Sequence, residues 1–202
     1  MVGHLRHIEE DLANRVAAGL AFDKMPDAPV TAAPVKEMKP SPALQIIGKM
    51  KDTLMGRAIG ILIADGSDGA VIKKIRKAAT DAGATVKIVA PKVGGVKLAD
   101  GSMLAVDGQL AGTPSVLFDA VAVILSDEGA KALSMESAAI DFVRDAFGHL
   151  KAIGVDTGGQ ALLKMANVAK DAGVVDTNDR NAFIAAAKTR QWDREESVRT
   201  LA

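Results

Sequence analysis

The alternation of apolar runs with amphipathic segments is the feature that most constrains this chain. Four apolar runs are typical of strands covered on both faces. They are residues 57–64, 84–91, 119–125 and 152–155. Four segments follow with the apolar spacing of helices. They are residues 70–83, 137–149, 160–170 and 181–190. This order predicts an α/β three-layer sandwich, with a mostly parallel sheet and helices on both faces.

A smaller element interrupts the alternation between the second and third predicted strands. Residues 96–98 and 103–106 are short apolar runs on either side of the turn-forming pair Asp100 and Gly101. Two such runs around an Asp-Gly turn predict an antiparallel hairpin. We therefore expect a hairpin insertion in the parallel sheet.

The first 42 residues have a different character. Apolar residues recur in steps of three and four through residues 4–20, which predicts an amphipathic helix. Five of the seven prolines lie within residues 23–42, and prolines at this density predict an extended linker. The expected organisation is a helix in residues 1–22, a Pro-rich linker in 23–42, and a domain in 43–202.

Composition excludes several classes of function. Lys plus Arg and Asp plus Glu each number 25, and the chain has one Trp and no Tyr, so it is not expected to bind nucleic acid. There is no Cys, which removes thiolate nucleophiles and Cys-ligated metals. No apolar run has the length of a membrane span, and the first residues lack a signal-peptide core. We expect a soluble cytoplasmic protein that does not bind membranes.

Two of the predicted strand ends carry candidate acid, base or anion-binding groups. The loop at 64–69 offers Asp65 and Asp68 as acid or base, or a helix N-terminus for an anion, but Ser67 or Asp68 as a helix cap is the simpler interpretation. At 126–130, Ser126 or Asp127 is a pocket residue or, again more simply, a cap. No G-x-G-x-x-G or Walker A pattern supports nucleotide binding.

The third strand end, IGVDTGGQALL at 153–163, resembles the turn on which α/β hydrolytic enzymes place a nucleophile. Thr157 stands at that position, but a hydroxyl needs a base within hydrogen-bond reach. His4 and His7 lie in the N-terminal helix, and His149 ends a predicted helix. We expect no catalytic triad, no metal site and no cofactor site.

Several stretches together resemble the large-subunit haem catalases, in the part that follows the catalase core. HLRHIEEDLANRVAAGL (4–20) is similar to the helical end of the core, and the Pro-rich segment to the family's linker. The stretches similar to the C-terminal domain are GRAIGILIADGSD (56–68), GATVKIVAPKVGGVKLADG (83–101), GTPSVLFDAVAVILSDEGAKAL (112–133) and DFVRDAFGHLKAIG (141–154). RQWDRE (190–195) is also in the family's style. The resemblance covers essentially the whole chain.

The resemblance implies a flavodoxin-like fold similar to the class I glutamine amidotransferase superfamily. Those enzymes carry a Cys-His-Gly sequence at the nucleophile turn, and TGGQALL places Thr157 and Gly158 where Cys and His would stand. The resemblance therefore implies a vestigial nucleophile turn at Thr157 and Gly158, with no catalytic residue.

The resemblance further implies a non-catalytic module of a peroxide-decomposing catalase, acting in stability or assembly. In a chain without the core, the apolar stripe of Leu5, Ile8, Leu12 and Val16 would be exposed, which predicts self-association or chaperone-like holding of clients. The module's partners would be the catalase core, like subunits in a homo-oligomer, and unfolded client proteins. Haem is expected only in the parent core, because haem catalases bind iron through a Tyr and this chain has none. Two alternatives stay open: a residual hydrolase or deglycase-like enzyme using Thr157, and a flavodoxin-like nucleotide module using the loop 65–69.

Overall fold

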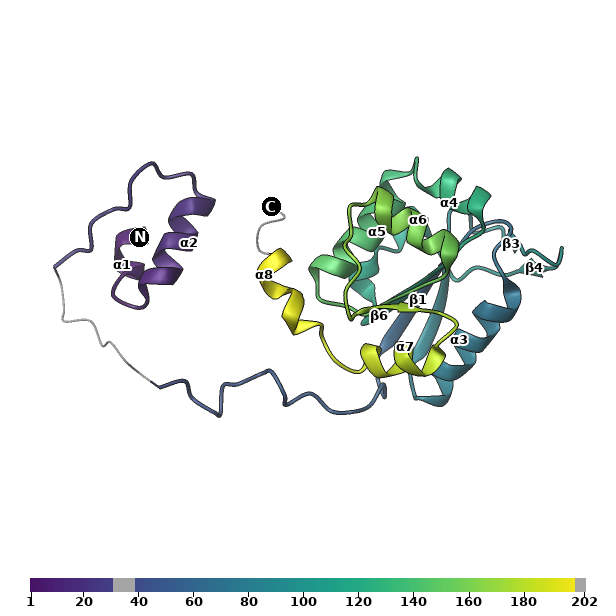
Figure 1. Cartoon of the computed structure of the whole chain (residues 1–202), viewed down its shortest axis with the longest axis horizontal. Coiled ribbons are helices and arrows are strands. Elements are labelled where there is room, and N and C mark those ends of the chain that lie inside the picture. Colours follow the sequence, from purple (N-terminus) through teal and green to yellow (C-terminus); the bar gives the residue numbers. More distant parts are fainter. Residues whose placement is uncertain (31–38, 199–202) are drawn as a thin grey trace. The chain divides into compact units, whose positions relative to one another are not determined.

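A computed structural model describes residues 1–30 and 39–198 (Figure 1). The chain divides into two compact units, Met1–Gly48 and Lys49–Ala202. The first unit is helical, and the second holds the sheet. Each unit is described by itself.

The first unit contains two helices, α1 (Val2–Leu5) and α2 (Glu10–Gly19), where the sequence predicted one helix over residues 4–20. The break is at Glu9, whose backbone is extended with φ −157°. Two side chains just before the break contact the backbone of the predicted linker. Arg6 donates to the carbonyl of Pro26, and a ring nitrogen of His7 lies 2.6 Å from the carbonyl oxygen of Pro29. Tertiary hydrogen bonds therefore override the helical periodicity here.

The break also changes which side chains the first unit buries. Val2, Ala13 and Ala17 are buried, whereas Ile8 and Leu20, both from the predicted apolar face, are 71% and 61% exposed. Within the predicted linker, residues 23–30 and 39–42 form no helix or strand. The remaining linker residues, 31–38, lie outside the described part of the chain.

The second unit is built on a six-stranded sheet in which every pairing is parallel, as the alternation predicted. In spatial order the strands are β5 (Gly108–Gln109), β2 (Thr85–Ala90), β1 (Ala58–Ile63), β6 (Ala120–Ile124), β7 (Ile153–Val155) and β8 (Val174–Asp176). The central strands β1 and β6 are buried almost throughout. The two edge strands, β5 and β8, were not among the predicted strands.

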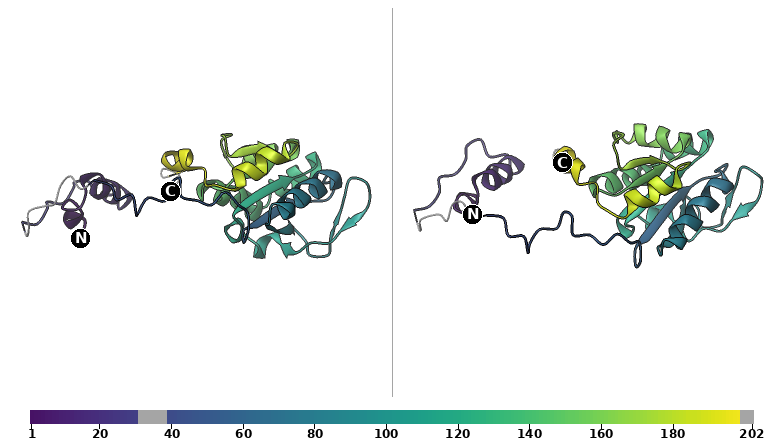
Figure 2. Two further views of the ribbon diagram at one scale, coloured as in Figure 1. Left: turned by 90° about the horizontal axis from the view of Figure 1, so that it is seen from below. Right: turned by 60° about the horizontal axis from the view of Figure 1, so that its bottom comes forward.

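Helices cover both faces of this sheet, which confirms the predicted three-layer sandwich (Figures 1 and 2). On one face are α3 (Gly69–Asp81) and α7 (Arg180–Ala187). On the other are α4 (Asp127–Leu133), α5 (Ser137–Gly148) and α6 (Thr157–Met165). The predicted hairpin is present as β3 (Val96–Lys97) and β4 (Met103–Leu104). The short elements are η1 (Leu110–Gly112), η2 (Ser115–Leu117), η3 (Trp192–Arg194) and α8 (Glu195–Val198).

Two local turns form hydrogen bonds with backbone groups of β8 on its outer edge, the edge that faces away from β7. Gly173 accepts a hydrogen bond from the amide of Ile153, and Thr177 donates to the carbonyl of Val155, so these residues face β7. Val174 and Asp176 therefore turn their peptide groups away from the sheet. The amide of Val174 donates to the carbonyl of Asp171, and the carbonyl of Asp176 accepts from Asp179.

Candidate functional site

The carboxyl ends of β1, β6 and β7 are the place where an open parallel sheet binds ligands. The chain runs from β1 to β2 on one side, and later to β6 on the other side of β1, so the order of strands reverses between β1 and β6. Three loops meet at this reversal, after residues 63, 124 and 155. They carry all the polar residues that the sequence singled out at strand ends.

In the loop after β1, the polar side chains bind backbone. Asp68 caps α3, with its Oδ1 accepting from the amides of Ala70 and Val71 at 2.7 and 3.2 Å. Ser67 is fully buried and donates to the carbonyl of Ile124 at 2.7 Å. Asp65 Oδ1 accepts from the amide of Lys97 at 2.8 Å. The cap interpretation of Asp68 is confirmed.

The loop after β6 has the same character. The Oγ of Ser126 accepts from the amide of Gly129 at 3.0 Å, which caps α4, and donates to the carbonyl of Asp65 at 3.0 Å. Asp127 is the first residue of α4 and is exposed. The hydroxyl of Ser126 therefore ties the first two loops together, as a cap rather than as a reacting group.

Asp156 organises the loop after β7, and the sequence interpretation missed it. Its Oδ1 accepts from the amide of Gly159 at 2.7 Å and caps α6, while its Oδ2 accepts from the amide of Leu125 at 2.9 Å. Burial raises the pKa of Asp156, against the effect of these two N–H donors, and the charge of Asp176 adds to the rise. An Asp directly after a strand and before a helical pattern was the available cue.

Thr157 is the first residue of α6, and its side chain is exposed. Among the described residues, the non-glycine residues with positive φ are Ala21, Leu150 and Asn167. Thr157 thus has an ordinary helical start, whereas a nucleophile turn holds its reactive residue in a strained conformation.

Gly158 lies directly on the end of β6. A Cβ atom at this residue would be 2.7 Å from the carbonyl carbon of Leu125 and 3.1 Å from the carbonyl oxygen of Ser126. Such distances leave no room for a side chain unless the backbone moves. A His in the place of Gly158 does not fit this turn.

The three histidines lie elsewhere. His149 follows α5, with its Nδ1 2.7 Å from the carbonyl oxygen of Asp145, and the chain passes from there to the amino end of β7. Thr157 follows the carboxyl end of the same strand, so the two residues flank opposite ends of β7. His4 and His7 belong to the first unit.

The described residues, 1–30 and 39–198, show neither a metal cluster nor a membrane-spanning helix. Within them, no group of three or more His, Asp or Glu side chains is placed to hold a metal ion. None of their helices is long and apolar enough to cross a membrane.

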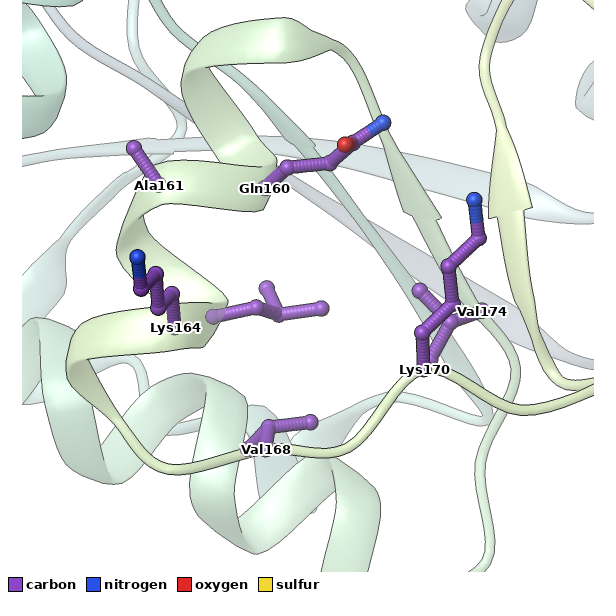
Figure 3. Close-up of a pocket in the computed structure, with 7 residues that line it drawn as sticks. Gln160, Ala161, Lys164, Val168, Lys170 and Val174 are labelled. Carbon is purple, nitrogen blue, oxygen red and sulfur yellow. The ribbon is translucent and has the colours of Figure 1, made fainter.

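Two cavities border the sheet. One, of about 320 Å³, lies at the ends of β1 and β2 beside α4, and its charged lining residues are Asp65, Lys92, Glu128 and Glu136. The other, of about 380 Å³, lies between α6 and β8 and is called the α6–β8 pocket below (Figure 3). Its lining residues are Gln160, Ala161, Leu163, Lys164, Val168, Lys170 and Val174.

Comparison with known proteins identifies the family. Residues 55–194 match the family model described as the C-terminal domain found in long catalases. The chain is 38% identical to "Catalase C" of Rhizobium meliloti over 98% of its own length, and 31% identical to "Catalase HPII" of Pseudomonas aeruginosa, also over 98%. It is 36% identical to "Catalase HPII" of Mycobacterium avium over 83% of its length. The matched regions make up 29%, 28% and 23% of these relatives. The chain therefore belongs to the family of C-terminal domains of long catalases.

Proposed function

We propose that this chain is a non-catalytic module that serves the stability and assembly of a long catalase. The carboxyl edge of its sheet supports this proposal most directly. Asp68, Ser126 and Asp156 cap three helices, and Ser67 binds the carbonyl of Ile124. Hydrogen bonds of this kind stabilise helix ends and join neighbouring loops, which supports a structural role for these side chains.

The donor set of this chain also does not fit haem. The family resemblance implies a Tyr as iron ligand and a His near the peroxide, and the chain has no Tyr. His149, in the sheet-bearing unit, is exposed, and its ring nitrogen is directed to the carbonyl of Asp145. In this proposal, peroxide decomposition belongs to the longer part of the catalase relatives that this chain does not match.

A spectroscopic and kinetic assay tests the non-catalytic assignment. The purified chain is incubated with haem, desalted, and assayed for a Soret band and for peroxide consumption. We expect neither to exceed the level of a buffer blank that received haem and was desalted in the same way. A Soret band with peroxide consumption proportional to it would overturn the assignment.

The residual hydrolase has its own test. The chain and its Thr157→Val variant are assayed with activated esters and with glycated amines. We expect no turnover by either protein. Turnover that disappears in the Thr157→Val variant would instead establish the enzyme alternative.

We further propose that exposed apolar side chains of the first unit form a contact surface. Ile8, Leu20 and Phe22 are 71%, 61% and 49% exposed. Large apolar groups left in water favour association with another surface. The surface of the catalase core, a second copy of this chain, or a partly unfolded client would each cover them.

A set of substitutions tests this surface. The triple variant Ile8→Ser, Leu20→Ser and Phe22→Ser is compared with Met135→Ser, which alters an 87% exposed residue of the second unit. Sedimentation velocity reports self-association, and light scattering of a heat-denaturing client reports holding. We expect the triple variant to lose both effects and the control to keep them. Equal behaviour of the two variants would contradict the proposal.

A further inference from the structure

The α6–β8 pocket is formed by the way the chain leaves α6. Asn167 has φ +55°, a left-handed conformation that Asn tolerates better than most residues. This turn brings the amide of Val168 to the carbonyl of Leu163 at 2.9 Å. Arg144 holds the end of the helix by donating to the carbonyl of Ala166 at 3.4 Å. Val168 and Lys170, in the segment that follows α6, therefore line the pocket opposite the helix.

The floor of the pocket is apolar. Leu163 and Val174 are 4% and 6% exposed, and Val168 is half-buried between them. A volume of about 380 Å³ is within the range of small-molecule sites.

The charged groups of the pocket are all cationic. Among the residues that line it, Lys164 and Lys170 carry charge and no Asp or Glu is present. Neither ammonium group is in a salt bridge with another described residue. The acidic residues that follow Lys170 are engaged elsewhere, because Asp171 pairs with Arg194 and Asp176 accepts from the amide of Asn178.

The polar ends of two lining residues lie on the same side of the pocket. In Figure 3 Gln160 extends from α6 and Lys170 extends beside β8, and the amide and ammonium ends reach the same end of the gap. The ammonium of Lys164 lies on the other side of α6 in this view. An anion at the Gln160–Lys170 end would receive an N–H donor from each residue.

We propose that the α6–β8 pocket binds an amphipathic monocarboxylate. The carboxylate lies between the Lys170 ammonium and the Gln160 amide, and the alkyl chain lies against Leu163, Val168 and Val174. This ligand matches the two chemical features of the pocket, an apolar floor and a single polar end with a cation. The assignment is independent of the non-catalytic role proposed above.

Titration of the full chain with octanoate tests the proposal. Isothermal calorimetry measures affinity, and amide NMR shifts locate the bound molecule. We expect saturable binding with the largest shifts at Leu163, Val168 and Val174. We expect Lys170→Gln to weaken binding about tenfold or more, because a hydrogen bond to a charged group is lost. Lys164→Gln is the matched control, with at most a small effect.

Two further measurements separate this site from general apolar binding. Octan-1-ol has the same chain without the charge and should bind more weakly than octanoate. Gln160→Leu removes the second N–H donor at an exposed helix position, and it should weaken octanoate binding while leaving the far-UV circular dichroism spectrum unchanged. The proposal is overturned if octanol binds as tightly as octanoate, if both Lys variants behave alike, or if Gln160→Leu leaves the octanoate affinity unchanged.

Discussion

The guanidinium carbon of Arg194 lies 3.9 Å from the ring centroid of Phe147. The Arg194 side chain is 1% exposed, and its Nε and Nη2 donate to the two carboxylate oxygens of Asp171 at 2.6 and 2.8 Å. Its Nη1 donates to the carbonyls of Phe147 and Lys151 at 3.2 and 2.9 Å. One side chain near the C-terminus thus joins α5, the start of β7 and the loop before β8.

Replacing Arg194 by Met should lower the free energy of unfolding by about 3–5 kcal/mol, because one partner of a largely buried ion pair is removed. Urea denaturation measures this change. Arg180→Met, at an exposed position of α7, is the control and should stay within about 0.5 kcal/mol of the unaltered chain. Equal stability of the two variants would contradict this role of Arg194.

The ion pair of Asp171 and Arg194 predicts that the chain loses stability at acid pH. Burial acts to raise the pKa of Asp171, but the hydrogen bonds and charge of Arg194, with two backbone amides, outweigh it and lower this pKa. A lowered folded-state pKa stabilises the fold at neutral pH, and the contribution is lost as pH falls through that pKa. We expect the unaltered chain to lose more stability than Arg194→Met on acidification, as followed by thermal denaturation between pH 7 and pH 2.

Lys151 should make the stability rise at alkaline pH. Lys151 is 3% exposed, and its Nζ donates to the carbonyl of Ser115 at 2.7 Å. Burial, together with the charge of Arg190, lowers the pKa of Lys151 from 10.5 to about 8. Between these two values the unfolded chain binds the extra proton, so the free energy of unfolding rises with pH. Across this range the lowered pKa of Lys151 adds on the order of 3 kcal/mol to the free energy of unfolding.

The Lys151→Met variant checks this dependence. We expect the stability of the unaltered chain, minus that of Lys151→Met, to increase from pH 7.5 to pH 10. Lys74→Met removes an exposed lysine of α3 and should show no such difference. A constant difference for Lys151→Met across this range would show that the residue has an ordinary pKa.

Gly158→Ala should destabilise the chain by about 1–3 kcal/mol, because the new methyl group would overlap the carbonyl group of Leu125. Gly148→Ala is a matched control at the end of α5, where a Cβ meets nothing within 4 Å. There the gain in helix propensity should leave stability unchanged or slightly higher. Thermal denaturation of both variants decides, and similar melting temperatures would show that the start of α6 can move away from β6.

Asp156→Ala should cost about 1–3 kcal/mol, because the cap of α6 is lost and the amide of Leu125 is left without its acceptor. Hydrogen exchange should become faster at Leu125 and Gly159. Asp156→Asn should retain one acceptor oxygen and cost less. If exchange at both amides were unchanged in Asp156→Ala, the hydrogen bonds would not be formed in solution.

The sequence predicted the elements whose burial has a local pattern. Strands β1, β2 and β6 are five- or six-residue segments rich in apolar residues, so their composition alone indicates them. β5, of two residues, and β8, of three, are defined by their pairing with β2 and β7. β7 also has only three residues, yet the apolar run 152–155 predicted it, so length alone does not separate it from β8. The seven-residue α4 is too short for a convincing period.

The helix caps at the strand ends could be predicted from the sequence, whereas the long-range packing contacts there could not. The sequence predicts Ser67 or Asp68 as one cap and Ser126 or Asp127 as another, and the structure shows that Asp68 and Ser126 are the caps. The sequence pattern predicts the start of α6 near Gln160, whereas the helix begins at Thr157 and includes Gly158 and Gly159, which are poor helix formers. Gly158 and Gly159 have no side chain, so α6 can lie close to the end of β6, and this contact is a long-range one. The partners of Arg194, 23 to 47 residues away, likewise have no local pattern.

The edge strand β8 limits how copies of this chain can associate. Of the four peptide groups that Val174 and Asp176 turn outward, two are already bound by the turns at Asp171 and Asp179. A strand from another molecule would find one donor and one acceptor at that border, too few for a stable ladder. Sheets of neighbouring molecules should therefore not merge into a continuous β-structure at the β8 edge.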